Sequence, residues 1–339
     1  MKALFVLVRL RVYDVLRNRS SAAFVLLFPV ILTLVVGFVF MHGHPFEKRY
    51  VAVVGAEDAP LARSVDALAP FEEVRVGKER SEAEAIGKLR ARMASAVVTR
   101  AEGEGVRIVV GPRDQLFGRG LLGALPVPAK LDVLEVPRWG YVHYLFPGLL
   151  TFSVMLSGLF GMGYPMALYR QNLFLKKLAT TPLPRVTFVA AQVAARTLLV
   201  LAQIALLVLA AWLGFGMHFT FASIAWLFAI ATLGLFVFLG AGFALACVIE
   251  NADLVVDVIS AVNMPLVFLS EIFFPLEALP RLLEVIGGIL PSTQMVRLLR
   301  AVLLYEVRDA GEIALGCGVL ALWAAAMFAI SLRTFKWHG

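Results

Sequence analysis

Polar side chains within the apolar segments are the residues of this 339-residue chain that are best placed to do chemistry. Gln192, Arg196 and Gln203 occur in one apolar run, and on a helix they fall within about 40° of one another. Because a polar group inside a membrane costs free energy unless it is paired or hydrated, this stripe needs an explanation. Either it lines a polar translocation path, or Arg196 extends to the lipid head groups while the glutamines bond to neighbouring helices.

A second polar group is acidic. Glu250, Asp253 and Asp257 follow one another at helical spacing and share a helix face. They are either the solvated edge of a loop, or the partners of Arg196 or of the basic segment at residues 169–185. Asp257 joins the stripe among the candidate residues of a translocation path.

The sequence gives no support for bond-making chemistry. The chain contains no GxxxxGK[ST] phosphate-binding loop, no HExxH motif and no recognisable nucleophile elbow. Its five histidines are scattered, and although His42 and His44 could share a metal with His143, loop histidines beside a span are more often solvated. We therefore expect no catalytic residue and no metal site, and we do not expect the chain to be an enzyme.

Composition indicates an integral membrane protein. Hydrophobic residues make up 60% of the chain and charged residues only 16%, whereas soluble domains carry about 25% charged residues. Basic residues that flank apolar spans on the cytoplasmic side explain the net charge of +7. No basic face interleaved with aromatic residues appears, so we expect no nucleic-acid partner.

Six stretches are apolar enough, over about 20 residues, to cross a membrane as helices. They are residues 22–41, 141–164, 187–212, 221–249, 254–274 and 313–332. The sequence therefore predicts an α-helical polytopic membrane protein with six transmembrane helices. Spans two to six lie within residues 140–335.

Basic residues set the orientation of these spans, because short cytoplasmic loops are enriched in Lys and Arg. Such residues precede the first span, follow the second and follow the sixth, whereas the loop GFGMHFT between spans three and four has none. We expect a multi-pass protein of the cytoplasmic (inner) membrane with both termini in the cytoplasm.

Residues 42–139 hold more than half of the charged residues of the chain, and the predicted orientation puts them outside. Four strand-like pieces, YVAVVG, FEEVRV, ASAVVT and GVRIVV, are interspersed with the helix-like pieces APLARSVDALAP and SEAEAIGKLRARM. Ser81 and Glu84 open the second helix as a capping box. The pattern predicts a small α/β extracytoplasmic domain inserted between the first and second spans.

Residues 1–21 are expected to form an amphipathic helix on the cytoplasmic membrane surface, with membrane lipid as a partner. Its apolar residues share one arc of about 120° and are Leu4, Phe5, Val8, Val12, Val15 and Leu16. A simple positively charged flank of the first span is the alternative.

Residues 275–308 contain apolar pieces that are too short to span and that are cut by Pro275, Pro280 and Pro291. Between spans five and six, such pieces predict a re-entrant helical hairpin that dips in from the outer surface. A broken helix of this kind is tolerated only where protein covers the freed backbone groups.

This layout and two local patterns resemble the ABC type-2 permease family, the membrane subunits of ATP-driven exporters. The basic segment YRQNLFLKKLATTPLPR is similar to the family pattern of Arg, Gly-Thr, Leu and a Thr-Pro-Leu-x-Arg ending. The stretch PLVFLSEIFFPLEALP, followed by LPSTQMVRLLRAVL, is similar to the hairpin pattern. The matching hairpin positions are Pro265, Ser270, Phe273, Phe274, Pro275, Pro280, Leu290, Pro291 and Arg300.

The resemblance implies a short cytoplasmic coupling helix, residues 168–182, that docks into a separate ATPase subunit. Leu173 and Phe174 replace the Gly-Thr of the family and Lys176 takes a usually acidic position, so we expect partner specificity at these residues. The residues expected to couple to the ATPase are Arg170, Leu173, Phe174, Lys176, Lys177, Leu178, Pro182 and Arg185.

Glu271 is a further departure, because it replaces the glycine that usually follows Ser270 in the family. It is a candidate residue of the translocation path near the outer mouth, where it would bear on a cationic substrate. A structural pair with Arg297 or Arg300 is the alternative.

The resemblance implies the permease subunit of an ATP-driven ABC exporter. It further implies two copies of an ATPase subunit, which would hold ATP and Mg²⁺, and a second permease half, identical or related. This chain would itself hold no cofactor. Two other functions stay open: an ion-coupled secondary transporter or channel that uses the polar stripe as a relay, and a non-transporting sensor whose external domain binds a partner.

Overall fold

The computed structural model describes residues 2–40, 49–55, 58–68, 74–79, 81–90, 94–101, 105–111, 114–134, 141–181, 183–273, 280–304 and 310–334. The chain divides into two compact units. The first comprises Met1–Val35, Phe146–Leu303 and Arg308–Gly339. The second comprises Val36–Leu145 and Leu304–Val307.

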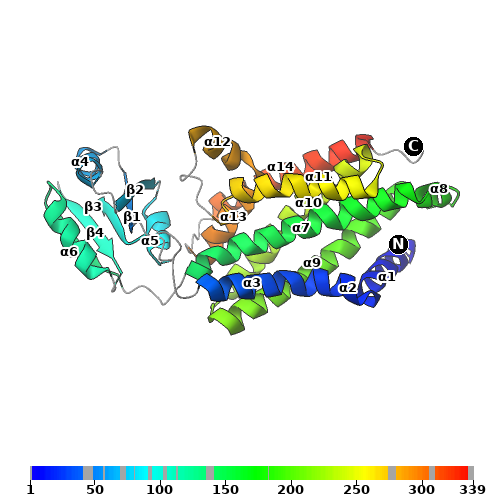
Figure 1. The fold of residues 1–339 in the computed structure, drawn as a ribbon, viewed down its shortest axis with the longest axis horizontal. Coiled ribbons are helices and arrows are strands. Elements are labelled where there is room, and N and C mark those ends of the chain that lie inside the picture. Colours follow the sequence, from blue (N-terminus) through cyan, green and yellow to red (C-terminus); the bar gives the residue numbers. More distant parts are fainter. Residues whose placement is uncertain are drawn as a thin grey trace. The chain divides into compact units, whose positions relative to one another are not determined.

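Long apolar helices build the first unit (Figure 1). In the part of the chain that the structure describes, five helices are long and apolar enough to cross a membrane. They are α7 (Tyr141–Gln171), α9 (Arg185–Phe215), α10 (Phe221–Val248), α11 (Ala252–Leu269) and α14 (Ala310–Thr334). They correspond to predicted spans two to six, and they fit a polytopic membrane protein.

Helix α7 continues beyond the predicted end of the second span, to Gln171. Its last turns stay helical because Leu168 and Tyr169 pack against the hydrophobic core of the helical unit. Earlier in the same helix, Gly158 faces α10, where an added Cβ would overlap Phe238. A small residue at such a position allows two membrane helices to approach closely.

The N-terminal part consists of α1 (Lys2–Arg17), α2 (Arg19–Ala22), the π-helical turn η1 (Ala23–Leu27) and α3 (Phe28–Phe40). Helix α1 packs against α9 (Figure 1). The predicted first span is thus helical, but its continuous apolar helix, Ala23–Val39, is shorter than the other candidate spans. The helix predicted over residues 1–21 ends at Arg17, and Asn18 separates it from α2.

Between α11 and α14 lie two shorter helices, α12 (Arg281–Ile289) and α13 (Pro291–Leu303), with their axes bent by 78°. The bend falls at Leu290, whose backbone is extended because Pro291 follows it. The predicted break between two short helices is therefore present, whereas their re-entrant path into the membrane stays a prediction. Pro275 lies outside the described residues.

The second unit contains the predicted α/β domain. Its five strands are β1 (Arg49–Val54), β2 (Val74–Glu79), β3 (Ala96–Arg100), β4 (Val106–Val110) and β5 (Ala129–Val133). They form one sheet of order β2-β1-β3-β4-β5, in which only the β3/β4 pair is antiparallel. The parallel pairs are joined through α4 (Ala59–Leu68), α5 (Glu82–Arg90) and α6 (Gln115–Ala124).

Alternating side chains divide the domain core between the two faces of this sheet. Val51 and Val53 belong to one buried cluster with residues of α4 and α6. Ala52 and Val97 belong to the opposite cluster with residues of α5. Because both faces of the central strands are buried, a piece such as YVAVVG is apolar along its whole length, and this made it recognisable as a buried strand.

The sequence reading missed α6 and β5. Three glycines within α6 lower its helical propensity. Helix α6 folds because Leu121 is buried against the sheet and Gly118 gives room to Val110 and Leu131. One of the two hydrogen bonds of the predicted capping box is present, because the backbone N–H of Glu84 donates to Ser81 Oγ at 3.2 Å.

Candidate functional site

The basic segment after α7 is divided by a sharp backbone turn. Leu173 has a φ of 55°, in the left-handed region, and α8 (Phe174–Ala179) begins after it. The hydroxyl groups of Thr180 and Thr181 donate to the carbonyls of Lys177 and Leu178 at 2.7 Å and close the helix. The single coupling helix predicted over residues 168–182 is therefore wrong in its bounds, because the left-handed residue ends α7 and separates α8 from it.

Helix α8 is anchored on one side and exposed on the other. Leu175 is 2% exposed, and the ring of Phe174 lies 4.9 Å from that of Tyr169. Lys176 and Lys177 are exposed on the same short helix. The segment therefore presents a basic surface on a packed base.

One of the predicted coupling residues adds little to this surface. Leu178 is partly buried against the helical core. Arg185 begins α9, although its side chain is not among those described, and Pro182 lies outside the described residues. The exposed surface thus consists mainly of Leu173, Phe174, Lys176 and Lys177.

Arg170 takes a different place from the one predicted. Its Nη1 donates to the carbonyls of Ala246 and Cys247 at 2.7 and 2.8 Å, at the last turn of α10. Its Nη2 lies 3.6 Å from a carboxylate oxygen of Glu250. Arg170 therefore satisfies terminal carbonyls of α10 and is not part of the exposed basic surface.

The neighbouring Gln171 makes an equivalent contact with the next helix. Its Oε1 accepts from the backbone N–H of Ala252 at 3.3 Å, at the first turn of α11. Arg170 and Gln171 together join the end of α7 to the junction of α10 and α11. We call this set of contacts the α7 clamp.

The acidic residues of that junction only partly behave as predicted. Glu250 pairs with Arg170 of the basic segment, which agrees with the alternative that these acidic residues are partners of that segment. Asp257 is exposed on α11, and in the described part of the chain it forms no ion pair with Arg196. The proposed Asp257–Arg196 pair is therefore wrong, because Arg196 is directed toward α7.

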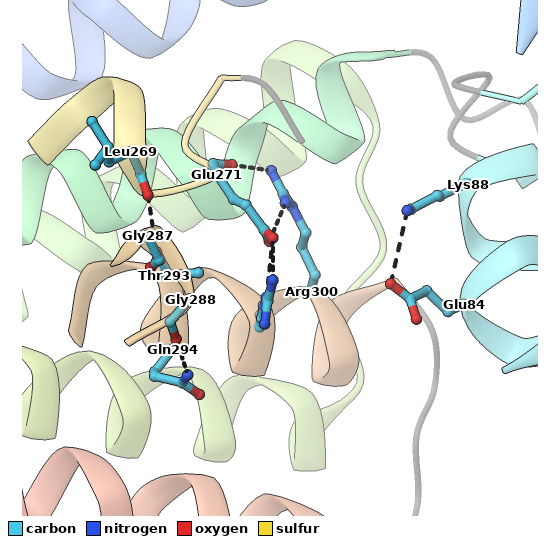
Figure 2. A network of polar contacts seen from close by, with 10 residues as sticks. Glu84, Lys88, Leu269, Glu271, Gly287, Gly288, Thr293, Gln294 and Arg300 are labelled. Carbon is cyan, nitrogen blue, oxygen red and sulfur yellow. Dashed lines mark hydrogen bonds and ion pairs between the residues drawn. The ribbon is translucent and has the colours of Figure 1, made fainter. Parts of the chain in front are cut away.

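The bent helix pair satisfies its own freed backbone groups, as Figure 2 shows. Thr293 Oγ1 donates to the carbonyl of Gly287 at 2.6 Å, and Gln294 Nε2 donates to that of Gly288 at 2.7 Å. Both carbonyls belong to the last turn of α12, and that of Gly287 also accepts from the backbone N–H of Leu290 at 3.1 Å. Side chains of α13 thus give the Gly288 carbonyl a donor and the Gly287 carbonyl a second donor, and these contacts join the two helices across the bend.

Glu271 links α11 to α13 (Figure 2). One carboxylate oxygen accepts from Nη2 of Arg297 at 2.5 Å, and the other lies 3.6 Å from Nη1 of Arg300. Arg300 Nη2 also donates to the backbone carbonyl of Glu271 at 2.6 Å. With Glu271 and Arg300 buried, this is a structural ion-pair network.

The contacts of Glu271 decide between its two interpretations. Its carboxylate is occupied by two arginines, so the assignment to a translocation path as a cation-binding group is wrong in this state. The backbone of Glu271 has a φ of 53°, in the region that favours glycine. The neighbouring Ser270 Oγ lies 2.5 Å from Ser292 Oγ, which adds a second contact between the end of α11 and α13.

The polar stripe of α9 faces α7. Gln203 is fully buried, and its Oε1 accepts from Ser157 Oγ at 2.8 Å. Arg196 Nε donates to the backbone carbonyl of the same Ser157 at 2.9 Å. The prediction that a glutamine bonds to a neighbouring helix is confirmed for Gln203.

Gln192 and Arg196 line a cavity of about 690 Å³ in the helical unit. Its walls come from α1, η1, α3, α7 and α9. Arg11 and Asp14 of α1 contribute charged groups to it. The guanidinium of Arg196 lies between α7 and α9, with Nε bound to the Ser157 carbonyl and the side chain against Gly161. Its extension to the lipid head groups stays a prediction.

Sequence reasoning missed the residues that complete these sites. Arg11 and Ser157 carry no motif, and Thr293 and Gln294 gain their role from the bend beside them. Gly161 is the residue that could best have indicated the Arg196 contact from the sequence, because a small residue in a span often marks a close contact. His42 and His44, considered above as metal ligands, lie outside the described residues.

Comparison with known proteins gives one informative result. Residues 115–304 match the model of the family described as ABC-2 type transporter. The match covers more than half of the chain and includes α6 to α13, with the basic segment, the polar stripe and the bent helix pair. No curated protein matches the chain.

Proposed function

The chain belongs to the ABC-2 type transporter family, and on this premise we propose that it is the permease subunit of an exporter driven by a separate ATPase. The family consists of membrane components of ABC transporters that are not themselves ATPases. The chain is accordingly a multi-pass membrane permease subunit. Export direction, the ATPase contact and the assembly are the proposal.

The observation that carries the proposal is the exposed basic surface of α8. Leu173 and Phe174 are 52% and 41% exposed, beside the exposed Lys176 and Lys177. A surface of two apolar and two basic residues suits a partner surface with an apolar depression rimmed by carboxylates. We assign this contact to the ATPase subunit.

The α7 clamp supports a route from that contact into the membrane helices. Motion of α8 would pull on the end of α7, which is joined to α10 and α11 through Arg170 and Gln171. A rigid link is needed because ATP binding and hydrolysis occur in another subunit. The bundle would then move between two states, one for each nucleotide state of the partner.

The proposed assembly contains two ATPase subunits, which hold ATP and Mg²⁺, and a second permease half. The excess of Lys and Arg at the N-terminus and in the basic segment supports a cytoplasmic location for these two segments. The membrane of this proposal is the inner membrane. The same rule puts the α/β domain on the outer side.

Site-specific photo-crosslinking in native membranes tests the ATPase contact. A photoreactive residue at Lys176 should crosslink to a nucleotide-binding subunit, identified by mass spectrometry of the product. The matched control is Phe221, which is 89% exposed at the start of α10, after the loop predicted to lie outside. Equal products from both positions, or none from Lys176, would contradict the proposal.

Cysteine labelling tests the orientation. With Cys247 and Cys317 replaced by alanine, single cysteines are introduced at Ser81 and at Lys176, both exposed. A membrane-impermeant maleimide added to intact cells should label Ser81→Cys only, and Lys176→Cys only after the cells are opened. The reverse result would exclude the proposed topology.

A further inference from the structure

The cavity lined by α1, η1, α3, α7 and α9 has an unbalanced charge. Three charged side chains line it, Arg11, Asp14 and Arg196. Asp14 is paired with Arg11 at 3.0 Å, as the next-turn neighbour on the same helix. For Arg196, no carboxylate of the described residues lies within ion-pair distance. The lining therefore carries one positive charge in excess.

Arg196 is held in place and does not move freely into solvent. Its Nε is bound to the Ser157 carbonyl, and Ser157 is itself fixed through its hydroxyl contact with Gln203. The guanidinium lies across Gly161 of α7, where an added Cβ would overlap it. A guanidinium fixed between two apolar helices needs an anion or water to offset its lost hydration.

The rest of the cavity is apolar and aromatic. Phe24 and Phe28 stack with their ring centroids 5.0 Å apart, and Phe160 and Tyr164 lie on the α7 side. The side-chain amide of Gln192 adds a hydrogen-bonding group beside Arg196. A cavity with one fixed cation and apolar walls suits a ligand with one acidic group and an apolar chain.

Arg11 is well placed to act as a second ligand to such an anion. Its guanidinium carbon lies 5.3 Å from the centre of the Tyr169 ring, and this contact holds it toward α7. Because Asp14 is 72% exposed, its pair with Arg11 is largely solvated and readily exchanged for a stronger anion. Two guanidinium groups on different helices would then enclose one head group.

We propose that this cavity binds an acidic amphiphile, such as an anionic phospholipid. Arg196 and Arg11 hold its head group, and Phe24 and Phe28 lie along its apolar chain. The binding site does not depend on the proposed export activity. An amphiphile that is cargo and one that is a resident lipid share this chemistry, so the experiment below separates them.

Binding is measured on the full-length chain, purified in a non-ionic detergent, by titration followed with native mass spectrometry. The probes are dioctanoyl phosphatidylglycerol, its zwitterionic phosphatidylcholine counterpart and inorganic phosphate. We expect one phosphatidylglycerol to bind at least about tenfold more tightly than the other two, because charge-assisted hydrogen bonds to two arginines are strong. Equal binding of both lipids would contradict the claim that the site selects an acidic head group. Equal binding of phosphate would contradict the claim that the ligand needs an apolar chain.

Variants identify the site. Arg196→Gln should weaken phosphatidylglycerol binding about tenfold or more, and Arg196→Lys by less, since it keeps the charge but loses the planar donor fork. The matched control is Lys176→Gln, which removes one charge from the exposed surface of α8 and should leave the affinity unchanged. Unchanged affinity in Arg196→Gln, or an equal loss in Lys176→Gln, would exclude this cavity.

A second variant tests the site even if Arg196→Gln does not fold. Arg11→Gln alters a side chain of α1 that is 22% exposed, and it should weaken binding about three- to tenfold. If Arg11→Gln folds and binds phosphatidylglycerol as tightly as the unaltered chain, the proposal that Arg11 and Arg196 together hold the head group is wrong.

Proteoliposomes that contain the chain and its ATPase separate cargo from resident lipid. Labelled phosphatidylglycerol that crosses the bilayer only with ATP is cargo, whereas binding without ATP-driven transfer identifies a resident lipid. Both results support the site. Failure of any nucleotide-binding ATPase to co-purify with the chain, with lipid binding intact, would count against the proposed function and not against the cavity.

Discussion

Leu173 and Glu271 hold a backbone conformation that residues other than glycine rarely adopt, with φ values of 55° and 53°. In the family pattern that the sequence resembles, glycine stands at both positions. The chain therefore keeps a glycine-like turn while placing a side chain there. At Glu271 the side chain forms a buried ion pair, and at Leu173 it lies on the exposed surface next to α8.

The left-handed turn at Leu173 can be tested through stability. Leu173→Gly should raise the free energy of unfolding by about 1 kcal/mol, because glycine avoids the steric cost of this region. Leu173→Val should lower it, since a β-branched side chain fits the region least well. Thermal unfolding in detergent should order the melting temperatures as Gly, Leu, Val. The control Leu175→Gly, at a buried helical position, should be strongly destabilised, and equal melting of the Gly and Val variants would contradict the argument.

Glu271 should be essential for the stability of the bent helix pair. Glu271→Ala should lower the free energy of unfolding by about 3–5 kcal/mol, because it leaves the buried Arg300 without its carboxylate. Glu271→Gly should lose about 1 kcal/mol less, since glycine tolerates the positive φ. Chemical unfolding of both variants in detergent measures the difference.

The control for this prediction is Glu250→Ala. Glu250 also pairs with an arginine, but at 3.6 Å and with 80% of its side chain exposed, so its removal should cost less than about 0.5 kcal/mol. If the Glu250 and Glu271 variants unfold alike, the network around Glu271 does not stabilise the fold.

At the scale of elements, the α7 clamp explains how a six-residue helix could act on a much larger bundle. Helix α8 is short, but the last turn of α7 before it is bound to the end of α10 and the start of α11. The bent pair of α12 and α13 is a second rigid element, because Thr293 and Gln294 bind carbonyls of the last turn of α12 across the bend. Both devices satisfy helix ends that would otherwise leave polar groups unpaired inside the protein.

Hydrogen exchange of the purified chain tests the clamp. Arg170→Met should speed amide exchange at residues 246–255, by about tenfold or more, because the α10 carbonyls lose their donor and the helix ends fray. Lys176→Met is the matched control, because it removes a nearby exposed charge without touching α10 or α11. Exchange that is equally fast in both variants, or unchanged in Arg170→Met, would exclude a clamp.

At the scale of the whole molecule, the two units are built on different principles. The helical unit buries few charges and exposes long apolar surfaces, as α9 and α14 show. The α/β unit has two buried clusters, one on each face of a five-stranded sheet. A sheet with its own core on both faces needs no membrane to be stable.

The α/β domain should therefore fold alone. A soluble fragment of residues 49–134 should show mixed helix and strand circular dichroism and a single cooperative thermal transition. Val97→Asp, which buries a charge in the core, should abolish this transition, whereas Lys78→Ala on an exposed position should shift it little. A fragment that unfolds gradually, or that is insensitive to Val97→Asp, would contradict an independent core.

Hydrophobic pattern and charge were enough to predict the long helices, the alternation of strands and helices up to β4, and the break between α12 and α13. These features follow from local sequence, because a span needs only length and apolarity, and a half-buried strand needs only alternation. Helix α6 and strand β5 escaped prediction because glycines and prolines obscure the pattern there, and packing against the sheet decides their structure.

The partners of the charged residues were decided only by the tertiary fold. The family resemblance assigned Arg170 to the coupling surface, but the rotation of α7 turns it toward α10. Arg11 and Arg196 are far apart in the sequence and meet at one cavity only because α1 packs against α9. Local sequence thus determined which segments form helices, strands and spans, whereas helix rotation and packing determined which charges face one another, because those contacts join residues that no local pattern relates.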